Sequence, residues 1–234
     1  MKHATLFIAL GGIVCALPWP LDLKWPWWLL WPGLNMIFLG IAYLRGDPLV
    51  FGKQTDGRLS KRKVLFFLPW LLLTRFVWHL SLLLLPESPI HLITSKLSVG
   101  RRLLSHELPN EIELVVDLTS EFEEPAGICE RVAYLALPIL DASAPEPREL
   151  LASMEAIDLS KHVLVHCAQG HGRTGLVAAV VLMMRGQARN ADEALATLRG
   201  IRPGVGLSHV QMECLQACEM ILQRKGCYSA SGSC

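Results

Sequence analysis

A segment of 22 residues, VLVHCAQGHGRTGLVAAVVLMM from Val163 to Met184, restricts the fold of this chain more than any other. It begins with a short apolar run, passes through three glycines, and ends in an almost wholly apolar run over residues 174–184. The first run is typical of a buried strand, and the second of a buried helix. A buried strand that leads into a buried helix predicts an α/β domain, in which helices cover a sheet.

Four residues between the predicted strand and helix carry chemistry: Cys167, Gly170, Gly172 and Arg173. Glycines permit a tight turn that points several N–H groups inward, and a helix N-terminus adds a positive field. An arginine fork can bind two oxygens of an oxyanion, and a cysteine in such a field is a nucleophile. The spacing therefore predicts a cradle for a phosphoryl group with a cysteine at its base.

The decapeptide HCAQGHGRTG, residues 166–175, resembles the HCxxGxxR[ST]G signature of the cysteine-dependent protein tyrosine and dual-specificity phosphatases. Its GHGRTG ending is similar to the signature of tensin-type lipid phosphatases. The resemblance covers about residues 97–225 and implies an α/β fold, a dual-specificity-phosphatase-like sheet flanked by helices. It also implies a catalytic mechanism that uses neither a metal nor a cofactor.

The resemblance implies a role for each residue of the loop. Cys167 attacks phosphorus and forms a thiophosphate, Thr174 supports departure of the thiolate, and His166 orients the loop from behind. The phosphoryl oxygens are held by Arg173 and the loop backbone, that is by residues Ala168, Gln169, Gly170, His171, Gly172 and Arg173. The His171 side chain is either exposed to solvent or adds positive charge to the cradle.

The family also needs a general acid that protonates the leaving oxygen. Asp141 is similar in position, because it follows an apolar strand and opens a Ser/Ala/Pro-rich loop. Asp158 and Glu146 are weaker candidates for the same role. The stretch RPGVGLSHVQ resembles the end of the domain in many members, and its Arg202 is more often a structural partner than a substrate contact. The stretch VVDLTSE resembles an early strand of the fold, where Asp117 is structural.

The activity implied is hydrolysis of phosphomonoesters, either of a phosphoprotein on Tyr, Ser or Thr or of a phospholipid headgroup. Tensin-type enzymes place lysines where Ala168 and His171 stand, so a polyphosphorylated inositol is disfavoured. The alternative is a catalytically inactive phosphate-binding module that recruits phosphorylated partners to the membrane. A net charge of +1 gives no reason to expect a nucleic-acid partner. The seven cysteines show no zinc-binding spacing.

Apolar runs predict strands within residues 111–120 and 131–140, in addition to the one within 161–167. Helices are predicted within residues 145–157, 190–200 and 208–226. Asn190 is a predicted N-cap, and Ser208 with Gln211 has the spacing of a capping box. The last residues, 226–234, are small and polar and predict a flexible tail.

The N-terminal third has a different composition and predicts a membrane region. Residues 3–21 and 25–44 contain no Asp, Glu, Lys or Arg, and a third apolar run spans 64–85. About 20 apolar residues can cross a bilayer as a helix. Trp19, Trp25, Trp27, Trp28 and Trp31 surround the break between the first two runs, as indoles do at a membrane interface. We therefore expect a transmembrane helical hairpin over 1–44, and a third membrane-associated helix with its linker over 64–90. Membrane lipid is then a further partner.

The loop between these regions, residues 45–63, carries six basic and two acidic residues, which favours a cytoplasmic location. The third run contains Arg75 and His79 near its middle, so it either spans with Arg75 facing other helices or lies in the interface. If it spans, the catalytic domain lies outside the cytoplasm. If it lies in the interface, the domain of this multi-pass membrane protein is cytoplasmic, where a reduced thiol is easier to maintain. We favour the cytoplasmic side.

Overall fold

The computed structural model describes residues 2–17, 27–84, 87–158 and 160–231. The chain divides into two compact units, one of residues 1–87 with 120–123 and one of residues 88–119 with 124–234. Two segments for which the sequence made predictions lie outside the described residues. They are the turn of the predicted hairpin, with Trp19 and Trp25, and the last three residues of the predicted tail.

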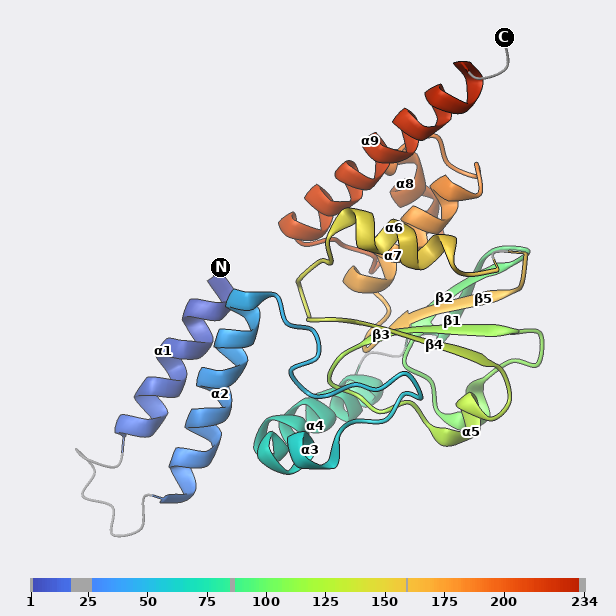
Figure 1. The fold of residues 1–234 in the computed structure, drawn as a ribbon. Helices are drawn as coiled ribbons and strands as arrows, with labels where there is room; N and C mark the ends of the chain where they lie inside the picture. Colours follow the sequence, from blue (N-terminus) through green and yellow to red (C-terminus); the bar gives the residue numbers. More distant parts are fainter. Residues whose placement is uncertain (1, 18–26, 85–86, 159, 232–234) are drawn as a thin grey trace. The chain divides into compact units, whose positions relative to one another are not determined.

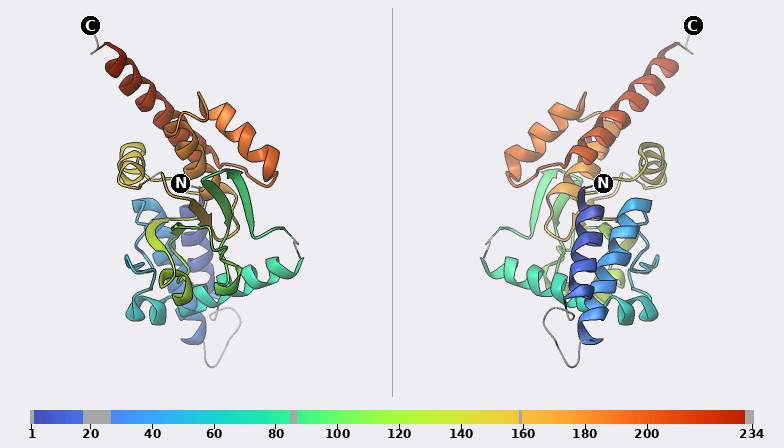
Figure 2. Two further views of the ribbon diagram at one scale, coloured as in Figure 1. Left: turned by 90° about the vertical axis from the view of Figure 1, so that its right-hand side faces the viewer. Right: turned by 90° about the vertical axis from the view of Figure 1, so that its left-hand side faces the viewer.

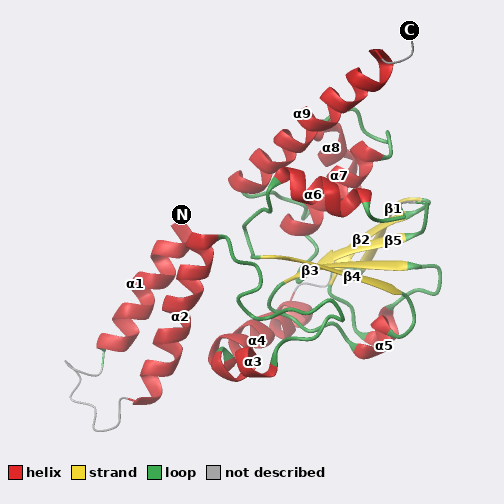
Figure 3. Cartoon of the chain, in the orientation of Figure 1, coloured by secondary structure: helices red, strands yellow, loops and turns green. Residues whose placement is uncertain are grey.

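The second unit is built on a five-stranded sheet, drawn as yellow arrows in Figure 3. Its strands are β1 (Ile90–Thr94), β2 (Leu97–Arg101), β3 (Leu114–Thr119), β4 (Ala133–Ile139) and β5 (Val163–Cys167), in the spatial order β1-β2-β5-β3-β4. Only β1 runs antiparallel to its neighbour, and the other pairs are parallel. The carboxyl ends of β2, β3, β4 and β5 therefore meet at one edge of the sheet, and ligands bind outside that edge in open α/β sheets.

Helices cover both faces of this sheet (Figure 1). One face packs against α6 (Pro147–Glu155), α7 (Gly172–Met184), α8 (Ala191–Ile201) and α9 (His209–Ser231). The other face packs against α5 (Ala126–Cys129) and against Leu103 and Leu108, which flank the short element η1 (Ser105–Glu107). Alternation along the strands divides the core in two, with Val163 and Val165 facing α7 and Leu164 facing the other side. The predicted α/β sheet flanked by helices is confirmed.

The helix signals read from the sequence are found at their predicted places. The Asn190 side chain accepts a hydrogen bond of 2.8 Å from Glu193 N and caps α8. Ser208 N donates to Gln211 Oε1 at 3.0 Å while Gln211 N donates to Ser208 Oγ at 3.3 Å, the reciprocal pair of a capping box. The last helix continues to Ser231, into the residues for which the sequence predicts a tail.

The first unit contains α1 (Lys2–Ala16), α2 (Trp27–Arg45), α3 (Lys61–Phe66) and α4 (Leu68–Leu84). The first two helices lie side by side, as both views in Figure 2 show. Their backbones approach closely at glycines: a Cβ on Gly11 would lie 2.7 Å from Gly33 O, and one on Gly40 would lie 2.8 Å from Ala4 O. Trp31 Nε1 and Asn35 Nδ2 both donate to Phe66 O, which joins α2 to the end of α3.

The expectation of a multi-pass membrane protein with a transmembrane hairpin is wrong. The three apolar runs form helices of 15, 19 and 17 residues. Among the described residues no helix combines the length and the apolar character needed to cross a membrane.

Candidate active site

Strand β5 carries Cys167 to the edge of the sheet where the parallel strands end. Every residue of β5 is buried, and Cys167 itself is 3% exposed. Because side chains alternate along a strand, Cys167 faces the helix side together with Val163 and Val165. Its neighbour His166 is directed to the opposite face, behind the loop that follows.

The loop after Cys167 turns tightly into the first residue of α7. Gly170 has φ of +76°, and its N–H donates to Cys167 Sγ at 3.2 Å. A Cβ on Gly170 would lie 2.4 Å from the carbonyl carbon and oxygen of Gly100, so no larger residue fits. An amide proton directed at the sulfur and the positive end of α7 both stabilise negative charge there.

Arg173, in the first turn of α7, joins the loop to the end of β4. Its side chain is 2% exposed, and its guanidinium donates from Nη1 to Ile139 O at 3.0 Å and lies with Nη2 3.3 Å from Asp141 Oδ1. The Asp141 side chain is 75% exposed, so its carboxyl can also be reached from solvent. The structure therefore brings Cys167, Arg173 and Asp141, which are distant in sequence, to one edge of the sheet.

The loop that carries Asp141 is held by the start of α9. Ser208 Oγ donates to Ala142 O, and Gln211 Nε2 donates to Ser143 O, both at 3.0 Å. Ala142 has φ of +55°, a conformation that a non-glycine residue adopts only when its surroundings impose it. Sequence reasoning identified Ser208 and Gln211 as a helix cap but missed their contacts with this loop, for which no local signal exists.

Arg202 is fully buried, and its guanidinium donates hydrogen bonds to backbone oxygens of the loop between Cys167 and Arg173. Its Nε donates to Gly170 O and its Nη2 to Gln169 O, each at 2.9 Å. Its Nη1 donates to Ser88 O at 3.0 Å and contacts His91 Nδ1 at 2.8 Å. These hydrogen bonds fix the orientation of the Gln169 and Gly170 carbonyl groups. We infer that Arg202 thereby positions the backbone N–H groups of the loop.

Replacing Arg202 by methionine, which keeps most of the apolar stem, should lower kcat/KM for an aryl phosphate on the order of 10²-fold. The loop would lose both hydrogen bonds to its carbonyls and with them its fixed geometry. The matched control is Arg199→Met in the last turn of α8, three residues before Arg202; the Nε of Arg199 donates to Val205 O, outside the loop. Equal losses in the two variants would show that Arg202 acts on stability alone.

A buried polar cluster lies behind the loop. His166 Nε2 is 3.5 Å from Glu124 Oε2 and 3.9 Å from Asp117 Oδ1, and all three residues are buried. Asp117 Oδ1 accepts from Thr119 N and Oγ1, and its Oδ2 accepts from Tyr134 Oη at 2.7 Å. Burial and the neighbouring Asp117 carboxylate raise the pKa of Tyr134, which keeps it a hydrogen-bond donor.

The same cluster offers three ligand atoms within 4.8 Å of one another, a spacing compatible with a metal ion. However, the carboxylate of Asp117 already accepts three hydrogen bonds from this chain, which satisfies most of its capacity. We therefore interpret the cluster as a support for His166, the residue that directly precedes Cys167.

The remaining predicted residues are divided between the site and other places. Thr174 is buried in the first turn of α7, and within the described part of the chain its Oγ1 has no hydrogen-bond partner. The half-buried His171 has its ring against Gly204, where a Cβ would lie 2.6 Å from Nε2. Asp158 precedes β5, at the opposite end from Cys167, and caps a turn through Ser160. Glu146 stands at the N-cap of α6.

Residues 94–223 match the model of a family described as "PTP-SAK: Swiss Army Knife protein, DSP-PTPase phosphatase domain". The chain belongs to this family. The match includes the residues of the site from Gly100 to Gln211, so these residues belong to a phosphatase domain of the dual-specificity type. It confirms the resemblance of the HCAQGHGRTG stretch to the phosphatase signature.

Solved structures agree with this assignment. The crystal structure of Tk-PTP in its active form is 30% identical, with a TM-score of 0.50, over 56% of this chain and 97% of that one. PTPMT1 in complex with PI(5)P is 18% identical, with a TM-score of 0.51, over 59% and 99%. A mouse putative dual specificity phosphatase complexed with zinc tungstate is 20% identical, with a TM-score of 0.51, over 60% and 92%. The last two share the fold of the phosphatase domain.

Proposed function

We propose that this chain hydrolyses phosphomonoesters through a covalent cysteinyl-phosphate intermediate formed on Cys167. The observation that carries the proposal is the hydrogen bond from Gly170 N to Cys167 Sγ, in a loop whose other end carries the buried Arg173. A sulfur that accepts a hydrogen bond from a backbone amide at a helix N-terminus is stabilised as an anion. The same amides can hold phosphoryl oxygens.

In the first step the Cys167 sulfur attacks phosphorus, an S–P bond forms, and the bond to the leaving oxygen breaks. Asp141 gives its proton to that oxygen. Arg173 and the backbone N–H groups from Ala168 to Arg173 hold the three equatorial oxygens as their charge develops. The distance of 3.3 Å between Arg173 Nη2 and Asp141 Oδ1 supports this assignment, since it sets the Asp141 carboxyl group beside the phosphoryl site.

In the second step water attacks phosphorus and passes a proton to the Asp141 carboxylate, the S–P bond breaks, and inorganic phosphate leaves. The Thr174 hydroxyl donates to the departing sulfur. His166, supported by Asp117 and Glu124, keeps the loop in place from the opposite face of the sheet. All these groups come from the catalytic domain, which we propose spans about residues 97–225, after the separate N-terminal region.

The substrate is either a phosphoprotein or a phospholipid headgroup. PTPMT1, which shares the fold, was solved with a phosphoinositide carrying one ring phosphate, PI(5)P. Ala168 and His171, at the loop positions where tensin-type enzymes have lysines, favour a substrate with a single phosphate. Initial rates of phosphate release from phosphotyrosyl, phosphoseryl and phosphothreonyl peptides and from mono- and polyphosphorylated inositol lipids would decide between the two classes.

The covalent step can be tested directly by acid quenching during turnover of a ³²P-labelled substrate. We expect label on the protein in an amount equal to the active enzyme, in the peptide that contains Cys167. Phosphate release without any labelled protein would mean that water attacks the substrate directly. Binding of phosphate without turnover would instead indicate the inactive phosphate-binding module.

Replacing Asp141 by asparagine should slow poor leaving groups far more than good ones. For an alkyl phosphate we expect a loss of roughly 10²–10⁴-fold in kcat/KM, because the leaving oxygen must be protonated as its bond breaks. An activated aryl phosphate with a stable leaving phenolate should lose less than roughly tenfold. The same substitution at Asp158, which lies at the other end of β5, is the control and should leave both substrates unaffected. Equal losses for both substrates in Asp141→Asn would contradict the acid role.

A further inference from the structure

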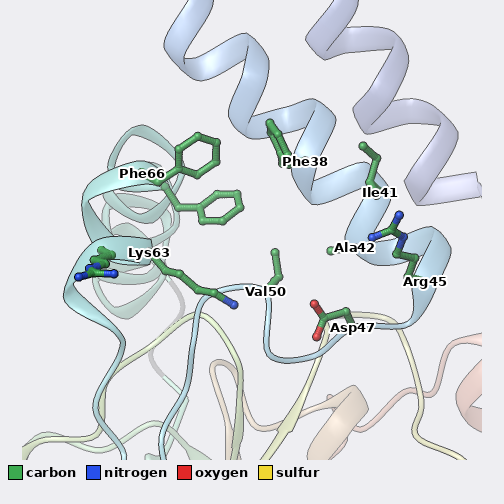
Figure 4. Close-up of a pocket in the computed structure, with 10 residues that line it drawn as sticks. Phe38, Ile41, Ala42, Arg45, Asp47, Val50, Lys63 and Phe66 are labelled. Atoms are coloured by element: carbon green, nitrogen blue, oxygen red, sulfur yellow. The ribbon is translucent and has the colours of Figure 1, made fainter.

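A cavity of about 340 Å³ in the N-terminal unit lies between α2, the turn that follows it, and α3 (Figure 4). All of its lining residues belong to the unit of residues 1–87 with 120–123. Its volume falls in the range of about 300–1,000 Å³ that is usual for small-molecule sites. None of the residues assigned to the phosphatase mechanism lines it, so it needs another explanation.

One end of this cavity is apolar. In Figure 4, Phe38 of α2 and Phe66 of α3 lie away from Asp47 and the Lys63 amine, and Ile41 lies on α2 above Arg45. The rings of Phe38 and Phe66 meet edge to face with centroids 5.3 Å apart, and Phe38 remains 48% exposed. Exposed aromatic surface held in a fixed arrangement can bury a hydrocarbon chain at little cost in conformational entropy.

The other end of the cavity is charged and mostly cationic. The charged residues that line the cavity are Arg45, Asp47, Arg62 and Lys63, which gives three positive charges against one negative charge, a net of +2. Figure 4 shows Arg45, Asp47 and the Lys63 amine at the end opposite the aromatic rings. Lys63 Nζ donates to Leu49 O at 2.6 Å, and Asp47 Oδ1 accepts from Leu49 N at 2.9 Å, so both groups also shape the turn.

We propose that this cavity binds an amphiphile with a single apolar chain and an anionic headgroup, of the fatty-acid carboxylate class. The chain packs on Phe38, Ile41 and Phe66, and the headgroup lies among Arg45, Arg62 and Lys63. An apolar end with a cationic end suits neither a hydrocarbon without charge nor a small inorganic anion, because each would satisfy only half of the site. This site is independent of the proposed phosphatase activity.

The test is calorimetric titration of the full chain with decanoate below its critical micelle concentration. Decyl maltoside supplies the chain without the charge, and acetate supplies the charge without the chain. We expect saturable binding of one decanoate, with decyl maltoside and acetate each at least about tenfold weaker. Decyl maltoside binding as tightly as decanoate would overturn the anionic assignment, and acetate binding as tightly would overturn the apolar one. Absence of decanoate binding would overturn the proposal as a whole.

Two substitutions with opposite expected effects locate the site. Arg62→Glu should weaken decanoate binding about fivefold or more, from the reversal of one charge near the headgroup. Asp47→Asn should tighten binding about fivefold, because it removes the one negative charge while an amide oxygen can still accept from Leu49 N. A variant that binds more tightly cannot be explained by loss of folding.

The matched control is Arg58→Glu, a reversal at an exposed arginine of the same basic segment that does not line the cavity. Its effect on decanoate affinity should be less than about twofold, since solvent screens a distant exposed charge. If Arg58→Glu weakens binding as much as Arg62→Glu, the ligand responds to overall charge and the cavity is not its site. Unchanged affinity in Asp47→Asn would contradict the assignment of the headgroup position.

Discussion

Replacing Cys167 by serine should reduce kcat/KM for an aryl phosphate at least about a thousandfold. The hydroxyl of serine stays protonated at neutral pH, so the amide of Gly170, which donates to the sulfur at 3.2 Å, has no anion to stabilise. The loop and Arg173 would remain in place, and the variant should still bind phosphate or vanadate. Progress curves with an aryl phosphate and a competition measurement with vanadate check the two halves of this expectation.

The control for this variant is Cys129→Ser, at a half-buried cysteine in α5. It makes the same chemical change on the other face of the sheet and should keep at least about half of the activity, since partly exposed substitutions usually cost little. If Cys167→Ser kept more than about a tenth of the kcat/KM of the unsubstituted protein, the nucleophile would be another group. Loss of vanadate binding together with activity would instead point to a collapsed loop.

Arg173→Lys is expected to have the second largest effect, a loss of roughly 10²–10³ in kcat for the same substrate. Lysine carries the charge but not the planar fork, so it cannot hold two phosphoryl oxygens and also reach Ile139 O and Asp141. Because charge is kept, the free energy of unfolding should change much less than the activity. Steady-state kinetics and urea unfolding on the same preparation separate the two.

Arg185→Lys is the matched control, an arginine at the C-terminal end of the same helix that donates to Lys96 O and Lys161 O. It makes the same change of headgroup far from the loop and should leave kcat within about twofold. A loss below about tenfold in Arg173→Lys would mean that charge alone suffices and that the fork has no role in the transition state.

The sequence predicted the central part of the site because that part is local. A strand, a glycine loop and a helix follow one another within residues 163–184, and each depends on the composition of its own segment. The glycine needed for close approach is Gly170, where the backbone meets Gly100. The first two strands were missed, because the stretch HLITSKLSVGR mixes polar and small residues and lacks a long apolar run.

The N-terminal region shows where composition misleads. An apolar run predicts that a segment is buried away from water, but it does not predict where the helices of that segment begin and end. Here the runs form helices of 15, 19 and 17 residues, and glycines bring α1 and α2 into close contact. Residues 120–123 lie within the stretch that matches the phosphatase family, and by their contacts they group with the N-terminal unit, where Lys53 Nζ donates to Phe122 O.

By itself the sequence determined the order of strand, loop and helix and the presence of a cysteine and an arginine at the two ends of the loop. Only the tertiary structure decided which residues support them. Arg202 reaches Gly170 O across 32 residues, and Arg173 reaches Ile139 O across 34. The difference has a physical reason: strands, turns and caps are set by interactions between near neighbours. The partners of a buried guanidinium are set by which strand ends and helix starts the packed core brings together.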